Sequence, residues 1–254
     1  MSGVVQDTVK EVVRNEEIPY QLSVFARSVE LYRELKEAGI VPDLVAGHSL
    51  GEYAAAYAAG SLSLEDGVRL VAERDRLMNE ASEINPGGMI ALIGADPKEV
   101  EEVAREQSGV VVAANLNTPR QTVISGEQGA MEALAEKVGG KGRQLKVAGA
   151  FHSPLMVEAA SGMELMLAET EFEEPETPMV SGMDGEIITT ADEVRTVLQR
   201  QMLSPVRWVA VIERFVDMEV GEVIEAGEDG TLTRMLRDFK DVDLKGKGAS
   251  EVLS

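Results

Sequence analysis

Cysteine is absent from this chain, and histidine and tryptophan are scarce. Among 254 residues there are no cysteines, two histidines and one tryptophan. Without cysteine the chain forms no disulfide, holds no metal through thiolates and offers no cysteine nucleophile. Two histidines are also too few for a histidine-rich metal cage. We therefore expect neither a metal site nor a bound cofactor.

Positive charge and long apolar runs are also in short supply. Lysine and arginine total 24 against 45 acidic residues, and the resulting net charge of −21 argues against nucleic-acid binding. No apolar run approaches the length that spans a membrane. The opening residues, MSGVVQDTVKEVV, lack the basic and then apolar segments of a signal peptide. We expect a cytoplasmic protein without nucleic-acid or membrane partners.

The length suits one large domain or two unequal ones, and 44% hydrophobic residues are enough for a sizeable core. In the first and last parts of the chain, helical patterns alternate with short apolar strands. Ser63 is expected to be the N-cap of a helix that ends near residue 81. Other helices are expected at 9–13 and 21–38, and strands at 40–46 and 222–227. The polar tail after Phe239 is expected to fray.

Residues 88–147 have a different character. Strands are expected at 88–94, 110–114, 121–125 and 143–147, and helices at 97–107 and 127–138. This β-α-β-β-α-β order is that of a ferredoxin-like unit. It predicts a small subdomain over residues 87–147, inserted into a large α/β subdomain made of residues 1–86 and 148–254.

The stretch DLVAGHSLGEYAAAYAAG, residues 43–60, places a serine on a sharp turn. The apolar residues before the turn are expected to end a buried strand, and the alanine-rich residues after it favour a helix. Gly47 and Gly51 let the backbone pass close to its neighbours on either side of Ser49. This is the G-x-S-x-G pattern of a nucleophile elbow, in which the Leu50 N–H faces a developing oxyanion. A tightly packed turn without a catalytic role is the alternative.

A serine nucleophile needs a base, and only two imidazoles are available. His48 adjoins Ser49 in an extended segment, so its side chain is expected on the opposite face of the strand. His152, in GAFHSPLM, precedes a proline that can start a helix, and it is the remaining candidate. The 45 acidic residues give no basis for choosing an acid to orient it.

Arg74 lies on the helix that follows the elbow. Apolar periodicity turns it inward together with Met78. A half-buried arginine needs an anion, and that anion is either part of a substrate or the carboxylate of a nearby acid.

Five segments together resemble the malonyl-CoA:acyl-carrier-protein transacylases and the acyltransferase domains of polyketide and fatty-acid synthases. They are GHSLGEYAA at 47–55, RLVAERDRLM at 69–78, NLNTPRQTVISG at 115–126, GAFHSPLM at 149–156 and QMLSPVRW at 201–208. The segments occur in the order and spacing of the family, and the similarity spans about residues 17–238. The resemblance implies an α/β-hydrolase-like large subdomain with a parallel sheet and agrees with the inserted ferredoxin-like subdomain.

The resemblance also implies a ping-pong acyl transfer from malonyl-CoA to acyl carrier protein. Ser49 would attack the thioester with His152 as its base, and the phosphopantetheine thiol of the carrier protein would then take the acyl group. The main-chain carbonyl of Gln201 would orient His152, so that no triad acid is needed. Arg74 would pair with the free carboxylate of the malonyl group through its guanidinium fork.

Further substrate contacts follow from the same resemblance. Asn115 and Asn117 match a polar loop that lines the active-site cleft. Phe151 looks like the bulky residue of malonyl-selective members, because a smaller side chain there would leave room for the methyl of methylmalonyl. Met78, one helical turn from Arg74, is expected to contact the substrate.

Two features depart from the family. Asp75 stands where glycine usually follows the arginine, and an acid there could compete for Arg74. In addition, no Gly-Gln dipeptide occurs in the chain, so the opening strand and Gly-Gln-Gly-Ser-Gln loop of the family are not found. Residues 1–16 are too polar to replace a central strand. We expect an unpaired slot beside the strand that ends at Ala46. Three outcomes are open: the amino-terminal residues fold into the slot, a second chain fills it, or the edge stays open and promotes aggregation. The second is favoured.

A basic stretch, KVGGKGRQLK, holds Lys137, Lys141, Arg143 and Lys146 without an acid. It is either a solvated strand edge or a docking site for the acidic carrier protein, which the net charge of −21 repels at long range.

Two other functions remain open at this point: an α/β-hydrolase-like serine esterase or thioesterase, and a catalytically impaired chain that acts as a binding module. An esterase transfers the acyl group to water, whereas a transferase passes it to a thiol. Labelling by a serine-reactive reagent distinguishes either enzyme from a binding module.

Overall fold

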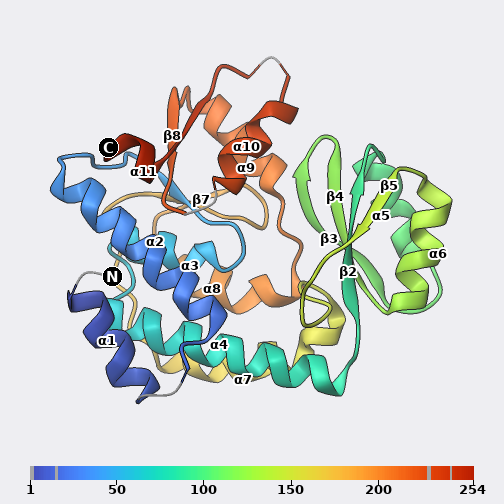
Figure 1. Ribbon diagram of the computed structural model, residues 1–254, viewed down its shortest axis with the longest axis horizontal. Coiled ribbons are helices and arrows are strands. Elements are labelled where there is room, and N and C mark those ends of the chain that lie inside the picture. Colours follow the sequence, from blue (N-terminus) through green and yellow to red (C-terminus); the bar gives the residue numbers. More distant parts are fainter. Residues whose placement is uncertain (1–2, 15–16, 228–229, 241) are drawn as a thin grey trace.

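The computed structural model describes residues 3–14, 17–227, 230–240 and 242–254, and it shows an α/β protein with two subdomains (Figure 1). The large subdomain contains helices α1 (Gly3–Val13), α2 (Tyr20–Glu37), α3 (Gly51–Ala58), α4 (Leu64–Ile84), α7 (Val157–Glu169), α8 (Ala191–Arg200), α9 (Trp208–Asp217), α10 (Thr231–Met235) and α11 (Ala249–Val252). Its strands are β1 (Val45–Ala46), β6 (Met179–Val180), β7 (Ile187–Ile188), β8 (Glu222–Glu225) and β9 (Lys245–Gly248). In the described residues no helix is long and apolar enough to cross a membrane.

Helix α4 is the centre of the large core, where it packs against α1, α2 and α7. The apolar stripe of α2, which includes Leu22, Phe25 and Val29, is fully buried in this core. Gly67 of α4 is required for the fit, because a Cβ there would lie 2.6 Å from Cζ of Phe25. Helix α4 begins as predicted, since the Ser63 side chain accepts a hydrogen bond from the Asp66 N–H at 3.0 Å.

The sheet of the large subdomain is short and mixed. Its order is β1-β6-β7, with β1 parallel to β6 and β6 antiparallel to β7. Strands β8 and β9 form a separate parallel pair. The predicted α/β fold with parallel strands is therefore confirmed in the described residues, where β1–β6 and β8–β9 are parallel pairs and only β7 adds an antiparallel strand.

Strand β1, which leads to the elbow, lies at a sheet edge. Val45 N–H donates to the Pro178 carbonyl at 3.0 Å, and within the described residues β1 pairs only with β6. Backbone groups alternate along a strand, so those of Leu44 and Ala46 point away from β6. These residues are half-buried rather than buried as predicted, because in the part of the chain that the structure describes no strand pairs with their outer side.

The N-terminal segment does not fill this edge. Residues 3–13 form a helix, α1, that is longer than the 9–13 predicted, and its Val5 and Val9 are fully buried. The helix packs against α2 and α4. Polar residues on its other face exclude a central strand, as expected from the composition.

The small subdomain has the predicted ferredoxin-like order. It contains β2 (Gly88–Ile93), α5 (Pro97–Glu106), β3 (Val111–Thr118), β4 (Gln121–Gly126), α6 (Gln128–Val138) and β5 (Lys141–Gln144). The sheet order is β3-β4-β2-β5, with every pair antiparallel. Helices α5 and α6 cover the face that points away from the large subdomain (Figure 1). The boundaries at residues 87 and 147 remain a prediction.

Three local details differ from the predictions. Residues 115–118 belong to β3 rather than to a turn, and β5 begins and ends earlier than expected. The tail after residue 239 does not fray throughout, because β9 pairs with β8, and Ala249 of α11 is buried beside Leu31 and Leu35 of α2.

The two subdomains are joined at the strand β3. The Leu116 N–H donates to the Val206 carbonyl, and the Val206 N–H donates to the Ala114 carbonyl, both at 2.8 Å. Arg207 also pairs with Glu101 of α5 at 2.7 Å. These contacts hold the small sheet against the segment that follows Gln201.

Candidate active site

Ser49 stands on a strained turn between β1 and α3. Its φ of 53° lies in the left-handed region, which residues other than glycine seldom adopt outside functional turns. A Cβ on Gly47 would lie 2.1 Å from the carbonyl carbon of Gly51, so only glycine fits at position 47. A Cβ on Gly51 would meet nothing within 4 Å, so the expectation that crowding requires both glycines is wrong for Gly51.

His152 lies directly against the serine. Its Nε2 is 2.7 Å from Oγ of Ser49. Its Nδ1 lies 2.8 Å from the Gln201 carbonyl and 3.1 Å from the Ser204 carbonyl. Carbonyl oxygens only accept, so Nδ1 carries the proton and the Nε2 lone pair accepts the serine hydroxyl. Two main-chain carbonyls thus orient the imidazole, and no carboxylate among the described residues bonds to it.

The environment of His152 keeps the imidazole neutral. Burial lowers its pKa to about 4, and the positive charge of Arg74 acts in the same direction. The hydrogen bonds to the Gln201 and Ser204 carbonyls oppose this shift but do not cancel it. At neutral pH His152 is therefore available as a proton acceptor for Ser49.

Arg74 is a buried cation beside the serine. Its side chain is 2% exposed. Nη2 donates to Oγ of Ser49 and to Oε1 of Gln201, each at 3.2 Å, and Nη1 donates to Oε1 of Gln21. Nε has no hydrogen-bond partner among the described residues. All of these partners are neutral, so the guanidinium charge is left for an anion that enters the site.

The acidic neighbours of Arg74 do not neutralise it. Burial raises the pKa of Glu52 to about 8, so this carboxyl is mostly protonated at neutral pH, although the Gly182 N–H at 2.9 Å and Arg74 favour its charged form. Asp75 bonds to the Gln21 N–H and to Asn79 rather than to Arg74. The expected competition between Asp75 and a substrate for Arg74 is not seen.

Leu50 follows the serine as the N-cap residue of α3. No acceptor for its N–H occurs among the described residues. The N–H lies at the positive end of the α3 dipole, and its role as donor to an oxyanion formed at Ser49 stays a prediction.

The polar residues of β3 lie on the His48 side of the turn. Oδ1 of Asn117 lies 2.8 Å from Nε2 of His48, and Nδ2 donates to Gln121. His48 thus bonds to a residue of the small subdomain, whereas His152 is the imidazole that bonds to Ser49. Asn115 bridges to Val206 through its backbone, and its buried Oδ1 has no partner among the described residues. Neither asparagine hydrogen bonds to Ser49 or His152.

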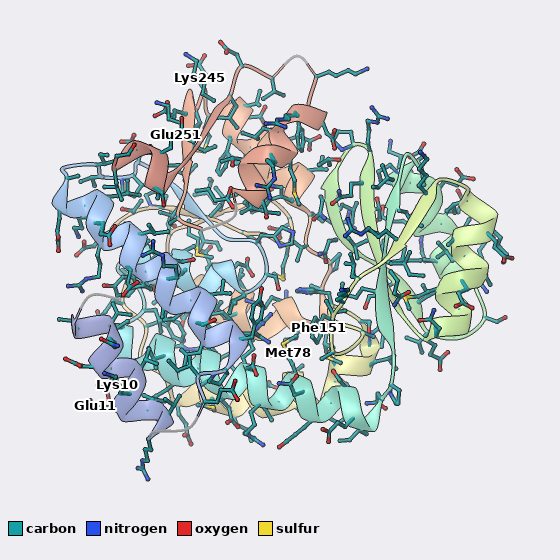
Figure 2. The ribbon with its side chains drawn as sticks, viewed as in Figure 1. Lys10, Glu11, Met78, Phe151, Lys245 and Glu251 are labelled. Atoms are coloured by element: carbon teal, nitrogen blue, oxygen red, sulfur yellow. The ribbon has the colours of Figure 1, made fainter. Side chains whose placement is uncertain are left out.

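Met78 and Phe151 form the apolar wall of the site. Met78 is 2% exposed, and Phe151 packs between the main core and the small-sheet cluster of Met89, Ala91, Ala114 and Val123. In Figure 2 the labelled side chains of Met78 and Phe151 lie between the helices of the large subdomain and the small sheet. Their contact with an acyl group on Ser49 stays a prediction.

The arrangement combines a nucleophile, a neutral base and a buried cation. Such a site can accept an acyl group and hold a carboxylate at its far end. In the described part of the chain no group of three histidine, aspartate or glutamate side chains could hold a metal ion.

The family of the chain follows from its match to a sequence model. The model described as an acyl transferase domain matches residues 4–249. The chain belongs to this acyltransferase family. A relative, the malonyl CoA-acyl carrier protein transacylase of Bacillus subtilis (strain 168), is 35% identical over 224 residues, which are 85% of this chain and 71% of the relative.

Solved structures agree with this membership. The acyl-carrier-protein S-malonyltransferase of Bartonella henselae has a TM-score of 0.90 and 30% identity, and the match covers 98% of this chain and 88% of that one. A malonyl transacylase in complex with an acyl carrier protein of a type II polyketide synthase has a TM-score of 0.88 and 31% identity over 96% of this chain and 87% of that one. The acyltransferase fold is thus shared along nearly the whole chain.

Two polar residues of the acyltransferase site escaped the sequence analysis. Gln21 bonds to Arg74, and its only signal was a polar side chain beside the apolar stripe of α2. Ser204 contributes only a carbonyl, which residue type does not reveal.

Proposed function

We propose that this acyltransferase moves a malonyl group from malonyl-CoA to the phosphopantetheine thiol of acyl carrier protein through an ester on Ser49. The observation that carries the proposal is the position of Arg74, whose Nη2 lies 3.2 Å from Oγ of Ser49. A buried guanidinium with neutral partners fits an acyl group that ends in a carboxylate, and its fork can bind both carboxylate oxygens.

The first half-reaction builds the ester. Ser49 Oγ attacks the thioester carbonyl while its proton passes to Nε2 of His152. The oxyanion of the tetrahedral intermediate faces the Leu50 N–H. When the carbon–sulfur bond breaks, the coenzyme A thiolate takes the proton from His152 and leaves malonyl-Ser49.

The second half-reaction reverses these roles. The thiol of the carrier protein gives its proton to His152 and attacks the ester carbonyl, and Ser49 leaves with that proton. Between the two proton transfers His152 is an imidazolium, and the Gln201 and Ser204 carbonyls stabilise it. Two neutral acceptors stabilise the imidazolium less strongly than a carboxylate does.

The transfer is tested by mixing malonyl-CoA with the chain and holo carrier protein and following the mass of the carrier protein. We expect malonyl carrier protein to form faster than free malonate. Release of malonate at the same rate with or without carrier protein would indicate an esterase. The predicted cytoplasmic location belongs to this proposal and is tested by fractionation of the cells that produce the protein.

The rate of Ser49 malonylation is expected to fall with decreasing pH only at pH values far below the usual pKa of histidine. A histidine with an ordinary pKa of about 6.5 would lose activity as the pH falls below that value. The pKa of His152 is lowered to about 4, so the base stays neutral and the rate stays constant until the pH approaches that value. Stopped-flow measurement of kcat/KM against pH, on protein shown to be folded, checks this. An acid limb near pH 6.5 would contradict the neutral buried imidazole.

Lys141 and Arg143 of the predicted basic stretch are exposed and face the site side of the small sheet, whereas Lys137 lies on α6. Lys141 and Arg143 lie on the edge strand β5, where Arg143 pairs with Ala91 of β2. Paired residues of antiparallel strands point to the same face, and Ala91 packs in the cluster that contains Phe151. We propose that this surface docks the acidic carrier protein.

Charge reversal tests this docking surface. We expect Lys141→Glu with Arg143→Glu to raise the KM for carrier protein roughly tenfold at low salt, since rim charges act mainly on association, and to leave the KM for malonyl-CoA unchanged. Lys98→Glu with Arg105→Glu, on α5 at the opposite face, is the control with the same change in charge. Equal effects of the two double variants would leave only the net charge as the cause.

We also propose that a segment of a second chain adds a strand beside β1. The outward backbone groups of Leu44 and Ala46 have no partner strand in the described residues, and their side chains share an apolar cluster with Val223 of β8. An unpaired edge of this kind favours strand addition.

A peptide that carries the opening strand and Gly-Gln-Gly-Ser-Gln loop of a family member tests the strand proposal. We expect it to slow hydrogen exchange of the Leu44 and Ala46 amides. The resemblance implies that the glutamine of this loop supplies a second oxyanion N–H. We therefore also expect the peptide to raise the rate of Ser49 malonylation by roughly 10²–10³-fold, the usual effect of one such donor. A scrambled peptide is the control, and unchanged exchange and rate would refute the proposal.

A further inference from the structure

The N-terminus of α2 meets the helix that carries Arg74, and one carboxylate joins the two. Pro19, the N-cap residue of α2, gives no side-chain cap, and the first turn of α2 has no acidic residue. Instead, Oδ1 of Asp75 accepts a hydrogen bond from the Gln21 N–H at 3.1 Å. Oδ2 accepts from Nδ2 of Asn79 at 2.8 Å. Asp75 of α4 therefore caps α2 from outside that helix, where a negative charge is favoured by the helix dipole.

Gln21 links Asp75 to the guanidinium of Arg74 through two hydrogen bonds. Its main chain is held by Asp75, and its side-chain Oε1 accepts a hydrogen bond from Nη1 of Arg74. Its Nε2 lies 3.5 Å from Sδ of Met78, a weak acceptor, so the oxygen end of the amide faces Arg74. A shift of the first turn of α2 would move the acceptor that fixes one edge of the guanidinium.

Asp75 also favours the charged form of Arg74 without forming a hydrogen bond to its guanidinium. Burial lowers the pKa of Arg74, and the nearby groups Tyr53, Glu52 and Asp75 act in the opposite direction. Both carboxylate oxygens of Asp75 are engaged by Gln21 and Asn79. Asp75 therefore occupies none of the guanidinium N–H groups, and Nε of Arg74 has no partner among the described residues.

We propose that Asp75 is a positioning residue that sets the preference for carboxylated acyl groups, because it fastens Gln21 and thereby aims the guanidinium of Arg74 at the end of an acyl group on Ser49. The proposal rests on malonyl transfer as the function. In this proposal Asp75 contributes to the selectivity for carboxylated acyl groups and does not compete with the substrate for Arg74.

Asp75→Ala and Asp75→Asn test the proposal. We expect Asp75→Ala to raise the KM for malonyl-CoA roughly tenfold, because Gln21 is then no longer held in place beside Arg74. Because an acetyl group has no carboxylate to hold, we expect kcat/KM for acetyl-CoA to stay within about twofold. Asp75→Asn keeps an acceptor oxygen for the Gln21 N–H and is expected to restore most of the malonyl preference. Asn79→Ala, which removes the other partner of Asp75, is the matched control and should leave the ratio unchanged.

A double-mutant cycle shows whether the effect passes through Gln21. If it does, Asp75→Ala adds little to Gln21→Ala in the malonyl-to-acetyl ratio, since interacting residues are not additive. Independent, multiplying effects would overturn the proposed route.

The outcomes also separate this proposal from the function on which it rests. If the unmodified chain forms malonyl-Ser49 and Asp75→Ala lowers malonyl and acetyl transfer equally, Asp75 is only a structural cap and the inference fails while the function stands. If the unmodified chain forms no malonyl ester, the function fails and the inference falls with it.

Discussion

His152→Ala is expected to slow the malonylation of Ser49 by roughly 10²–10⁴-fold, the range for loss of a general base. The imidazole accepts the serine hydroxyl at 2.7 Å, and two carbonyls keep its other nitrogen protonated. No second base lies within hydrogen-bond reach of Ser49 in the described residues, because its other partner is the guanidinium of Arg74. Rapid-quench measurement of the acyl-enzyme, with mass detection, gives the rate.

His48→Ala is the matched control, since it removes the other imidazole of the chain. His48 bonds to Asn117 and packs beside Trp208, with ring centroids 5.6 Å apart. We expect this variant to lose some stability but to keep most of its acylation rate. A loss as large as that of His152→Ala would show that the imidazole at position 152 has no special role.

Arg74→Ala is expected to lower kcat/KM for malonyl-CoA by roughly 10²-fold, as truncation of one member of a buried charge pair does. An acetyl group has no carboxylate, so acetyl-CoA should lose far less. Arg74→Lys keeps the charge but loses the fork, and it should fall between the two. Steady-state comparison of the two thioesters gives the selectivity. Loss of the Arg74 charge should also raise the pKa of His152, because that charge is one cause of its lowering.

Arg69→Ala, five residues earlier on α4, controls for a change in net charge. Arg69 is exposed and lies 3.6 Å from Asp66. The malonyl-to-acetyl ratio should not change in this variant. If Arg74→Ala lowers both substrates equally, Arg74 is a structural residue that supports Ser49 and Gln201 rather than a carboxylate receptor.

Much of the site could be predicted because it depends on residue types at fixed spacing. The G-x-S-x-G turn needs a glycine at position 47, where any Cβ would strike the backbone, and this requirement is visible in the sequence. With only two histidines in the chain, His152 was the remaining candidate for the base. The helical periodicity of apolar residues predicted that Arg74 faces the interior. The alternation of strands and helices in residues 88–144 was sufficient for the ferredoxin-like order.

The remaining features depend on tertiary contacts that no local pattern encodes. Asp75 can bond either to Arg74 or to the N-terminus of α2. Which of the two it bonds to depends on where α2 begins relative to α4. The half-burial of β1 follows from its place at a sheet edge, where in the described residues only β6 pairs with it, rather than from its own apolar residues. The tail after residue 239 looked polar, yet the main chain of β9 pairs with β8 irrespective of its lysine side chains.

The most direct test of malonyl transfer through Ser49 is to locate the acyl group after brief incubation with malonyl-CoA. Proteolytic digestion and tandem mass spectrometry should find one malonyl ester, on Ser49, which disappears when holo carrier protein is added. Ser49→Ala should carry none. A malonyl adduct that persists in Ser49→Ala, or an ester on Ser49 that carrier protein does not remove, would contradict acyl transfer through this serine.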